Sequence, residues 1–244
     1  MATQQERDEV LKLFAGLRVT DVCDGMDAVG LQDVGLMDKR IMPLWRDAER
    51  FAHRIYGFAH TVRFVPTNKR APTFATVEEH ARWKSDWYSQ LANAPRADEL
   101  RDGDVLVIDA AGVPDCGFIG SSNSLSWMIA GVRGAVTNGG ARDTDEIMRQ
   151  HFPVYAPGVS RGIRPGRLEL ESTNKPVTVG GVFVRPGDVV VADGDGVIVV
   201  PWEKAREVAE FAAAVQARDA AGRRERFPKV GLEPDFTVEP GDAK

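Results

Sequence analysis

The chain has 244 residues, and its 43% hydrophobic content is enough to bury a large core in one domain or in two small ones. Its formal net charge is −5, so general nucleic-acid binding, which needs a basic face, is not expected. No apolar run approaches the roughly 20 residues of a membrane span, and the polar first residues lack the apolar core of a signal peptide. We therefore expect a cytoplasmic protein that binds neither nucleic acid nor membrane.

The N-terminal part of the chain predicts two helices, a strand and an insertion. Apolar residues recur at helical spacing early in the chain, and an alternating β-branched run that a proline closes follows later. We expect helices at 6–17 and 22–29, a strand at 57–65, and an insertion at about 66–98 that holds one helix.

The middle of the chain alternates strands with helices, which is the α/β pattern. The apolar run 105–109 is continuous and ends in an acid, which suits a strand buried on both faces. We expect further strands at 134–138 and 153–156, and helices at 125–130 and 145–151.

The last third is rich in β-strand signals and ends in a helix. Two valine-rich runs around a glycine pair predict a hairpin, and an amphipathic stripe of alanine and valine predicts the helix. We expect the hairpin at 177–184, strands at 189–193 and 197–201, the helix at 203–218, and an extended tail beyond 227.

The first candidate site is the run 138–143, which follows a predicted strand and precedes a predicted helix, where α/β proteins place ligands. Two glycines let the backbone approach a ligand closely, and Arg142 offers a planar fork that suits a carboxylate. Asp143 is an oxygen ligand for a cation such as Mg²⁺. A glycine turn with a surface ion pair and an aspartate N-cap explains the same residues, so both interpretations stay open.

The second candidate site is the glycine- and serine-rich run 117–124, which leads from a predicted strand into a helix. Free backbone N–H groups at a helix N-terminus attract anions, and the side chains of Ser121, Ser122 and Asn123 offer further hydrogen bonds. A well-capped helix start is the alternative. The run is not a P-loop, because no Gly-Lys-Ser/Thr follows it.

The other polar candidates have structural explanations. Asp109, Asp115, Asp193 and Asp195 suit turns and strand ends. The four histidines are scattered without metal-ligand spacing, and we interpret them as structural. Cys23 and Cys116 form no CxxC pair, so we expect reduced thiols.

Three segments together resemble the signature of a known family: 134–146, the loop at Gly120, and 179–197. This RraA-like family contains the class II 4-hydroxy-4-methyl-2-oxoglutarate aldolases and the regulators of ribonuclease E activity. The resemblance covers roughly 19–215, weakly through the insertion. It implies a single domain over 1–244 with an α/β/β swivelling-domain fold, mixed sheets and flanking helices, plus a C-terminal helix and tail at about 203–244. It also implies a homotrimer or homohexamer with sites at subunit boundaries.

The resemblance implies roles for both candidate runs. Arg142 would hold a 2-oxo acid and stabilise its enolate, while Asp143 would anchor Mg²⁺, Mn²⁺ or another divalent cation, largely through waters. A cation and a guanidinium at the ketone oxygen stabilise the enolate without a Schiff-base lysine. The loop would present its backbone N–H groups to the substrate carboxylate from Gly120, Ser121, Ser122 and Asn123.

The sequence departs from the aldolase pattern at two positions. Ser121 stands where the aldolases carry an acid that organises proton transfer, and Asn138 replaces the aspartate before the glycine pair. Asp115, or an acid of another subunit, is the candidate replacement for the missing acid.

The expected function is that of a Mg²⁺-dependent lyase acting on a 2-oxo acid. The reaction would be retro-aldol cleavage of 4-hydroxy-4-methyl-2-oxoglutarate-type substrates, or oxaloacetate decarboxylation giving pyruvate. One alternative is a non-catalytic regulator that binds a ribonuclease, although the insertion and the C-terminal region make this chain longer than such regulators. Another is a divergent lyase or hydratase of the same fold, with Ser121 marking the divergence.

Overall fold

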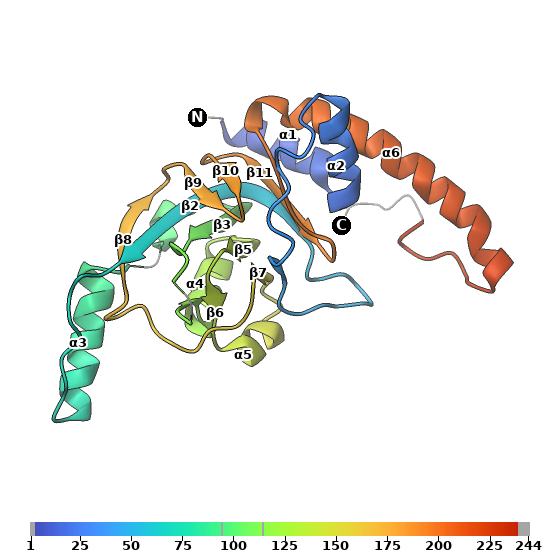
Figure 1. Cartoon of the computed structure of the whole chain (residues 1–244). Helices are drawn as coiled ribbons and strands as arrows, with labels where there is room; N and C mark the ends of the chain where they lie inside the picture. The colour runs from blue at the N-terminus through green and yellow to red at the C-terminus, as the bar shows by residue number, and fades with distance from the viewer. Residues whose placement is uncertain (1–2, 94, 114, 239–244) are drawn as a thin grey trace.

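The computed structural model describes residues 3–93, 95–113 and 115–238, which form a mixed α/β fold (Figure 1). The main sheet is built from eight strands: β1 (Met42–Pro43), β2 (Ile55–Pro66), β3 (Asp104–Asp109), β5 (Gly134–Thr137), β7 (Val154–Ala156), β8 (Leu168–Thr173), β11 (Val189–Asp193) and β12 (Gly196–Val200). Their order is β1-β7-β5-β3-β2-β11-β12, and β8 pairs with β2. Two small pairs complete the strands: β4 (Gly117–Ile119) with β6 (Gly140–Ala141), and β9 (Val177–Val179) with β10 (Val182–Val184).

The helices agree with the sequence prediction in type and order. They are α1 (Gln4–Phe14), α2 (Val19–Ala28), α3 (Val77–Gln90), α4 (Ser121–Ile129), α5 (Thr144–Arg149) and α6 (Ala205–Arg226). The last helix runs eight residues beyond the predicted end at 218, and a 3-10 turn, Phe227–Val230, begins the tail that was predicted as extended. The final residues of that tail, 239–244, lie outside the described residues.

The centre of the sheet is parallel, and its strands are buried on both faces. β2, β3, β5 and β7 run parallel, while β11 and β12 are antiparallel. Along β3, Val105 and Val107 contact the core under the β9–β10 hairpin, whereas Leu106 and Ile108 contact the core under α3 and α4. This double burial explains why the predicted strand is a continuous apolar run rather than an alternating one.

Three helices cover the antiparallel part of the sheet (Figure 1). Residues of α1, α2 and α6 pack on Val189 and Val191 of β11 and on Ile198 and Val200 of β12. The alternate residues of these two strands face the β9–β10 hairpin instead. The sheet therefore lies between a layer of helices and the β9–β10 hairpin, which gives a three-layer arrangement.

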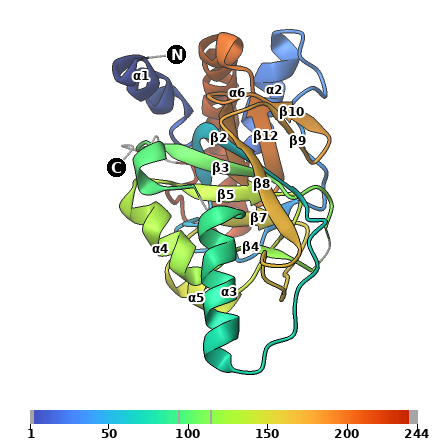
Figure 2. The same cartoon turned by 90° about the vertical axis from the view of Figure 1, so that its left-hand side faces the viewer.

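Helix α3 is the one helix of the predicted insertion and extends from the body of the protein (Figures 1 and 2). Its C-terminal half is fastened to the core by Trp87, which is 5% exposed. The indole Nε1 of Trp87 donates a hydrogen bond to the backbone oxygen of Leu168 at 2.9 Å, and the ring contacts that of Trp83. The side chains near the C-terminal end of α3 are thus held in fixed positions relative to the sheet.

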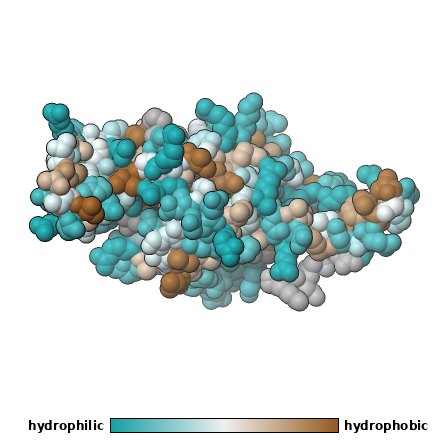
Figure 3. Space-filling model, turned by 90° about the horizontal axis from the view of Figure 1, so that it is seen from below, coloured by the Kyte–Doolittle hydropathy of each residue, from teal (hydrophilic) through white to brown (hydrophobic). Residues whose placement is uncertain are grey.

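The outer surface is mainly polar. Figure 3 shows a largely hydrophilic face with small, separate apolar spots. Scattered apolar side chains of this kind are normal on a protein surface and by themselves identify no partner. Within residues 3–93, 95–113 and 115–238, no helix combines the length and the apolarity that crossing a bilayer requires.

Candidate active site

The two predicted candidate runs meet beyond the carboxyl ends of β3 and β5. The short parallel strands β4 and β6 join them, with Gly117 opposite Gly140. The Arg142 N–H donates a hydrogen bond to the backbone oxygen of Ile119 at 2.9 Å. Ligands of open α/β sheets bind at this edge of the parallel strands, so the location agrees with the predicted site.

Asp143 lies between the two candidate runs and contacts both of them. It occupies the N-cap position of α5 with φ of 56°, yet its side chain makes no capping hydrogen bond to that helix. Instead, its Oδ2 accepts the Ser121 N–H at 3.2 Å, and its Oδ1 accepts the Nε–H of Arg142 at 3.2 Å. The carboxylate is therefore turned toward the N-terminus of α4 and does not cap α5.

Two glycines allow this close approach between the runs. A Cβ on Gly117 would lie 2.8 Å from Cγ of Arg142, and a Cβ on Gly120 would lie 2.9 Å from Oδ2 of Asp143. Both distances are shorter than side chains normally permit, so any larger residue would move Arg142 or Asp143. The glycines of the predicted loop thus leave the space that the side chains of Arg142 and Asp143 occupy.

The residues at the start of α4 have two different roles. The N–H of Ser121 is already used by Asp143, and its backbone oxygen accepts the Nε2–H of Gln150 at 3.1 Å. Ser122 and Asn123 line the adjacent cavity, and N–H groups in the first turn of a helix have no intrahelical partner. The predicted donors Ser122 and Asn123 therefore face the cavity, whereas Ser121 holds Asp143 in place.

The cavity beside these residues has a volume of about 540 Å³. Its charged lining side chains are Lys84, Arg142, Asp143 and Arg164, so cations outnumber carboxylates three to one among the described residues. Tyr88 of α3 also lines it. An excess of positive charge next to a free helix N-terminus suits an anionic ligand.

Lys84, Tyr88 and Arg164 did not emerge as site residues from the sequence. Lys84 and Tyr88 lie in the insertion, and Arg164 lies between Ile163 and Pro165 in a segment without periodicity. No local motif marks them, because only the packing of α3 against the core brings them to the cavity that Arg142 also lines.

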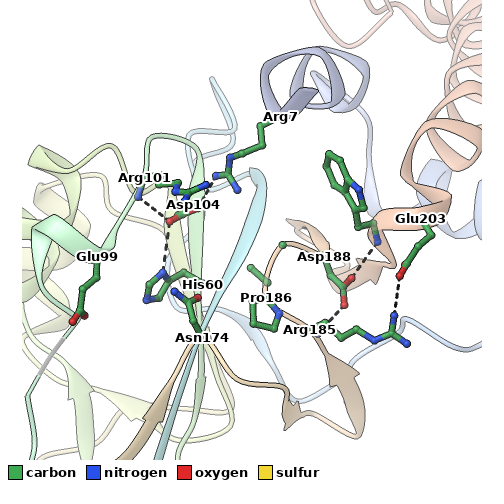
Figure 4. Close-up of a pocket in the computed structure, with 13 residues that line it drawn as sticks. Arg7, His60, Glu99, Arg101, Asp104, Asn174, Arg185, Pro186, Asp188 and Glu203 are labelled. Atoms are coloured by element: carbon green, nitrogen blue, oxygen red, sulfur yellow. Dashed lines mark hydrogen bonds and ion pairs between the residues drawn. The ribbon is translucent and has the colours of Figure 1, made fainter. Parts of the chain in front are cut away.

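A second cavity, of about 420 Å³, lies at the opposite end of β3 (Figure 4). Its charged groups largely neutralise one another: Arg7 pairs with Asp104 at 2.7 Å, and Arg185 pairs with Glu203 at 2.9 Å. Asp188 accepts the backbone N–H groups of Arg185 and Trp202. This internal pairing explains the charged residues of that cavity as structural ones, and the first cavity is the better candidate site.

A family model described as RraA-like, Aldolase/RraA, matches residues 19–199. The chain belongs to the RraA-like family. The crystal structure of RraAS2 from Streptomyces coelicolor, described as an unusual member of the RNase ES inhibitor RraA protein family, superposes with a TM-score of 0.68. The two are 25% identical, and the match covers 88% of this chain and 96% of that one.

Two curated relatives extend the comparison. Protein DlpA of Legionella pneumophila is 26% identical over 207 residues, which cover 85% of this chain and 30% of that protein. A Halalkalibacterium halodurans protein named "Putative 4-hydroxy-4-methyl-2-oxoglutarate aldolase" is 34% identical over 128 residues, covering 52% of this chain and 60% of the relative. The matches thus span less than two thirds of the length of both relatives. Of these two relatives, the Halalkalibacterium halodurans protein carries the name of an aldolase.

The predicted metal position offers one carboxylate. Among the described residues, no group of three histidine, cysteine, aspartate or glutamate side chains is placed to hold a metal ion. Asp143 is about one-third exposed; its Oδ2 accepts the N–H and, at 3.5 Å, the hydroxyl of Ser121, while its Oδ1 accepts only Arg142, which leaves a lone pair on Oδ1. Mg²⁺ commonly binds through one or two carboxylates and keeps several waters, so this arrangement fits a water-rich Mg²⁺ site and no all-protein cage.

The acids proposed as structural have local partners. Asp109 accepts the amide of Asn138 at 3.0 Å, and Asp115 accepts the guanidinium of Arg161 at 2.5 Å. The Arg161 guanidinium holds the pKa of the Asp115 carboxyl at about 2. A carboxyl that is ionised and engaged in this way is a poor proton donor, and Asp115 is not among the described residues that line the cavity.

The cysteines are free thiols, as predicted. Cys116 is buried, and burial raises the pKa of its thiol to about 11. The protonated form of a thiol is a weak nucleophile, so Cys116 has the properties of a core residue rather than of a catalytic one.

Proposed function

We propose that this chain is a divalent-metal-dependent lyase that acts on a 2-oxo acid. The reaction is retro-aldol cleavage of a 4-hydroxy-4-methyl-2-oxoglutarate-type substrate, or decarboxylation of oxaloacetate, and gives pyruvate. The observation that carries the proposal is the Asp143 carboxylate, held beside Arg142 at the N-terminus of α4 and turned toward it rather than toward the helix that Asp143 begins. The aldolase names of RraA-like relatives support the reaction class.

The chain's own groups would bind the 2-oxo acid end of the substrate. The free N–H groups of Ser122 and Asn123 suit the carboxylate, because they stand at a helix N-terminus beside the cavity. Arg142 lines the same cavity, and its guanidinium can reach both the carboxylate and the 2-oxo oxygen of a small bound acid. These contacts orient the bond between the third and fourth carbons for cleavage.

Cleavage of that bond leaves negative charge on the 2-oxo oxygen, as an enolate. The other fragment leaves as CO2 from oxaloacetate or, after its hydroxyl proton passes to water, as a second keto acid. The enolate then takes a proton from water at its third carbon, which gives pyruvate. Arg142 stabilises the charge of the enolate, because its guanidinium donates several N–H groups and Asp143 fixes the Nε edge at 3.2 Å. A divalent cation bound at Asp143 would supply further electrostatic stabilisation of the enolate. Ser121 keeps the Asp143 carboxylate in position through its N–H, which gives Ser121 a supporting role.

The proposal is tested by assaying purified protein with oxaloacetate and with 4-hydroxy-4-methyl-2-oxoglutarate, in the presence of Mg²⁺ or Mn²⁺. We expect pyruvate release that is lost on adding EDTA and in Arg142→Ala. Arg161→Ala is the matched control, because Arg161 is exposed and pairs with Asp115 instead. Activity that survives EDTA or Arg142→Ala would refute the proposal.

Regulation of a ribonuclease is the second candidate, favoured by the structural similarity to RraAS2. This alternative needs no small-molecule site, so it leaves the excess of cations in the cavity unexplained. Capture of ribonuclease E by the intact chain, together with an absence of lyase activity, would favour the regulator. The trimer or hexamer implied by the family resemblance stays a prediction, which the molecular mass in solution tests.

A further inference from the structure

Arg164 is a buried cation on the wall of the candidate active site. Its side chain lines the cavity together with Arg142, yet Arg164 is only 5% exposed. Its guanidinium contacts the faces of two aromatic rings, with the guanidinium carbon 5.2 Å from the ring centre of Phe64 and 5.0 Å from that of Tyr88. Burial lowers the pKa of Arg164, and the Tyr88 hydroxyl is its hydrogen-bonding neighbour.

No carboxylate among the described residues pairs with this guanidinium. The acids nearby in the sequence are engaged elsewhere: Asp115 binds Arg161, and Glu169 binds Lys69 at 2.6 Å. A buried charge is costly unless it is paired, and contacts with aromatic faces offset only part of that cost. A buried arginine that lines a cavity without a carboxylate partner is therefore suited to an anion that enters the cavity.

Lys84 adds a second cation to the same wall. It lies on α3 one turn before Tyr88, is half-buried, and forms no ion pair with any residue that the structure describes. The C-terminal half of α3 is fastened by the buried Trp87, so Lys84 and Tyr88 are presented from a fixed helix rather than from a loose loop. Rigid presentation lowers the entropic cost of binding a ligand.

We propose that Arg164, assisted by Lys84, is a specificity-determining residue that binds the distal carboxylate of a dicarboxylic 2-oxo acid. The two anionic ends of one substrate would then occupy two subsites of the 540 Å³ cavity. Arg142 and the start of α4 take the 2-oxo acid end, and Arg164 with Lys84 takes the far carboxylate. The inference rests on the proposed function for the assignment of the first end, and it gives the inserted helix a role in substrate choice.

The test is calorimetric titration of the intact protein with three probes in the presence of Mg²⁺. The probes are 2-oxoglutarate, 2-oxobutyrate, which lacks the second carboxylate, and glutarate, which lacks the 2-oxo group. We expect 2-oxoglutarate to bind the parent protein about ten-fold or more tighter than 2-oxobutyrate, as one charge-assisted contact provides. In Arg164→Gln this preference should vanish, while the affinity for 2-oxobutyrate is unchanged.

Two further variants keep the test decisive. Arg161→Gln removes an arginine three residues away that does not line the cavity, and it should keep the full preference. Lys84→Gln changes a half-buried helix position, so it should fold normally and reduce the preference several-fold even if Arg164→Gln is unstable. A preference that persists in both Arg164→Gln and Lys84→Gln overturns the inference.

The probes also separate this inference from the proposed function. If 2-oxobutyrate binds but 2-oxoglutarate binds no more tightly, the distal subsite is refuted and the 2-oxo acid site stands. If 2-oxobutyrate does not bind but glutarate binds and is weakened by Arg164→Gln, the anion subsite stands and the 2-oxo acid assignment fails. If none of the three probes binds, both are refuted.

Discussion

Replacement of Gly120 by alanine tests how strongly activity depends on the position of the Asp143 carboxylate. The backbone of Gly120 is extended, with φ of −131° and ψ of 162°, which any residue adopts without strain. The added Cβ would lie 2.9 Å from Oδ2 of Asp143, about 0.5 Å inside the 3.4 Å at which ordinary van der Waals contact begins. Because the obstructing atom ends a flexible side chain, the carboxylate can move away at little cost to the fold.

We therefore expect Gly120→Ala to reduce activity far more than stability. A misplacement of 1 Å costs about 100-fold in rate, so a shift of half that size should lower kcat/KM about ten-fold. The free energy of unfolding should stay within about 1 kcal/mol of the parent value, since alanine also restricts the unfolded chain. The assay compares pyruvate release with the urea midpoint of the same preparations.

Gly222→Ala is the matched control for this experiment. Gly222 lies within α6, and a Cβ there would meet no atom within 4 Å. Alanine is the better helix former by about 1 kcal/mol, so the control should gain stability and keep full activity. Full activity in Gly120→Ala would refute the idea that this glycine exists to admit Asp143.

Three further predictions concern the core. Burial lowers the pKa of His60 below its usual 6.5, so the unfolded chain binds more protons than the folded protein as the pH falls through 6.5. The free energy of unfolding, measured by urea titration, should therefore fall as the pH falls, and its dependence on pH should be smaller in His60→Gln. Tyr155→Phe should cost about 1 kcal/mol, because the buried hydroxyl donates to the backbone oxygen of His53 at 2.7 Å, and thermal unfolding measures the loss. A thiol reagent at pH 8 should label Cys23 in the native protein well before the buried Cys116, and equal labelling rates would contradict the packing.

The sequence predicted the α/β frame because the main elements carry strong local signals. The run 105–109 is apolar throughout, and the structure buries β3 on both faces. Strand β8, Leu168–Thr173, is not among the predicted strands, although its sequence Leu-Glu-Leu-Glu-Ser-Thr begins with an apolar–polar alternation. Four alternating residues are a weak signal, and the strand forms by pairing with the outer end of β2, a contact that depends on a distant segment of the chain.

The two candidate runs could be singled out from the sequence because the residues of each run are neighbours in the chain. Arg142 and Asp143 are adjacent, and the glycine loop precedes a helix, so both runs have local signatures. The sequence could not decide whether Asp143 caps α5, because that depends on its left-handed backbone and on its hydrogen bond with the Ser121 N–H at the start of α4. Arg164 could not be predicted as a site residue for a similar reason. Its burial and its lack of a carboxylate partner among the described residues arise from tertiary packing alone.

The most direct test of the central claim is a Mn²⁺ titration followed by electron paramagnetic resonance, with oxalate as an inert mimic of the enolate. We predict that the parent protein binds Mn²⁺, that oxalate tightens this binding, and that Asp143→Asn loses most of it while remaining folded. Asparagine keeps the size of the side chain and tolerates the left-handed backbone at this position. Undiminished, oxalate-sensitive Mn²⁺ binding in Asp143→Asn would contradict the account.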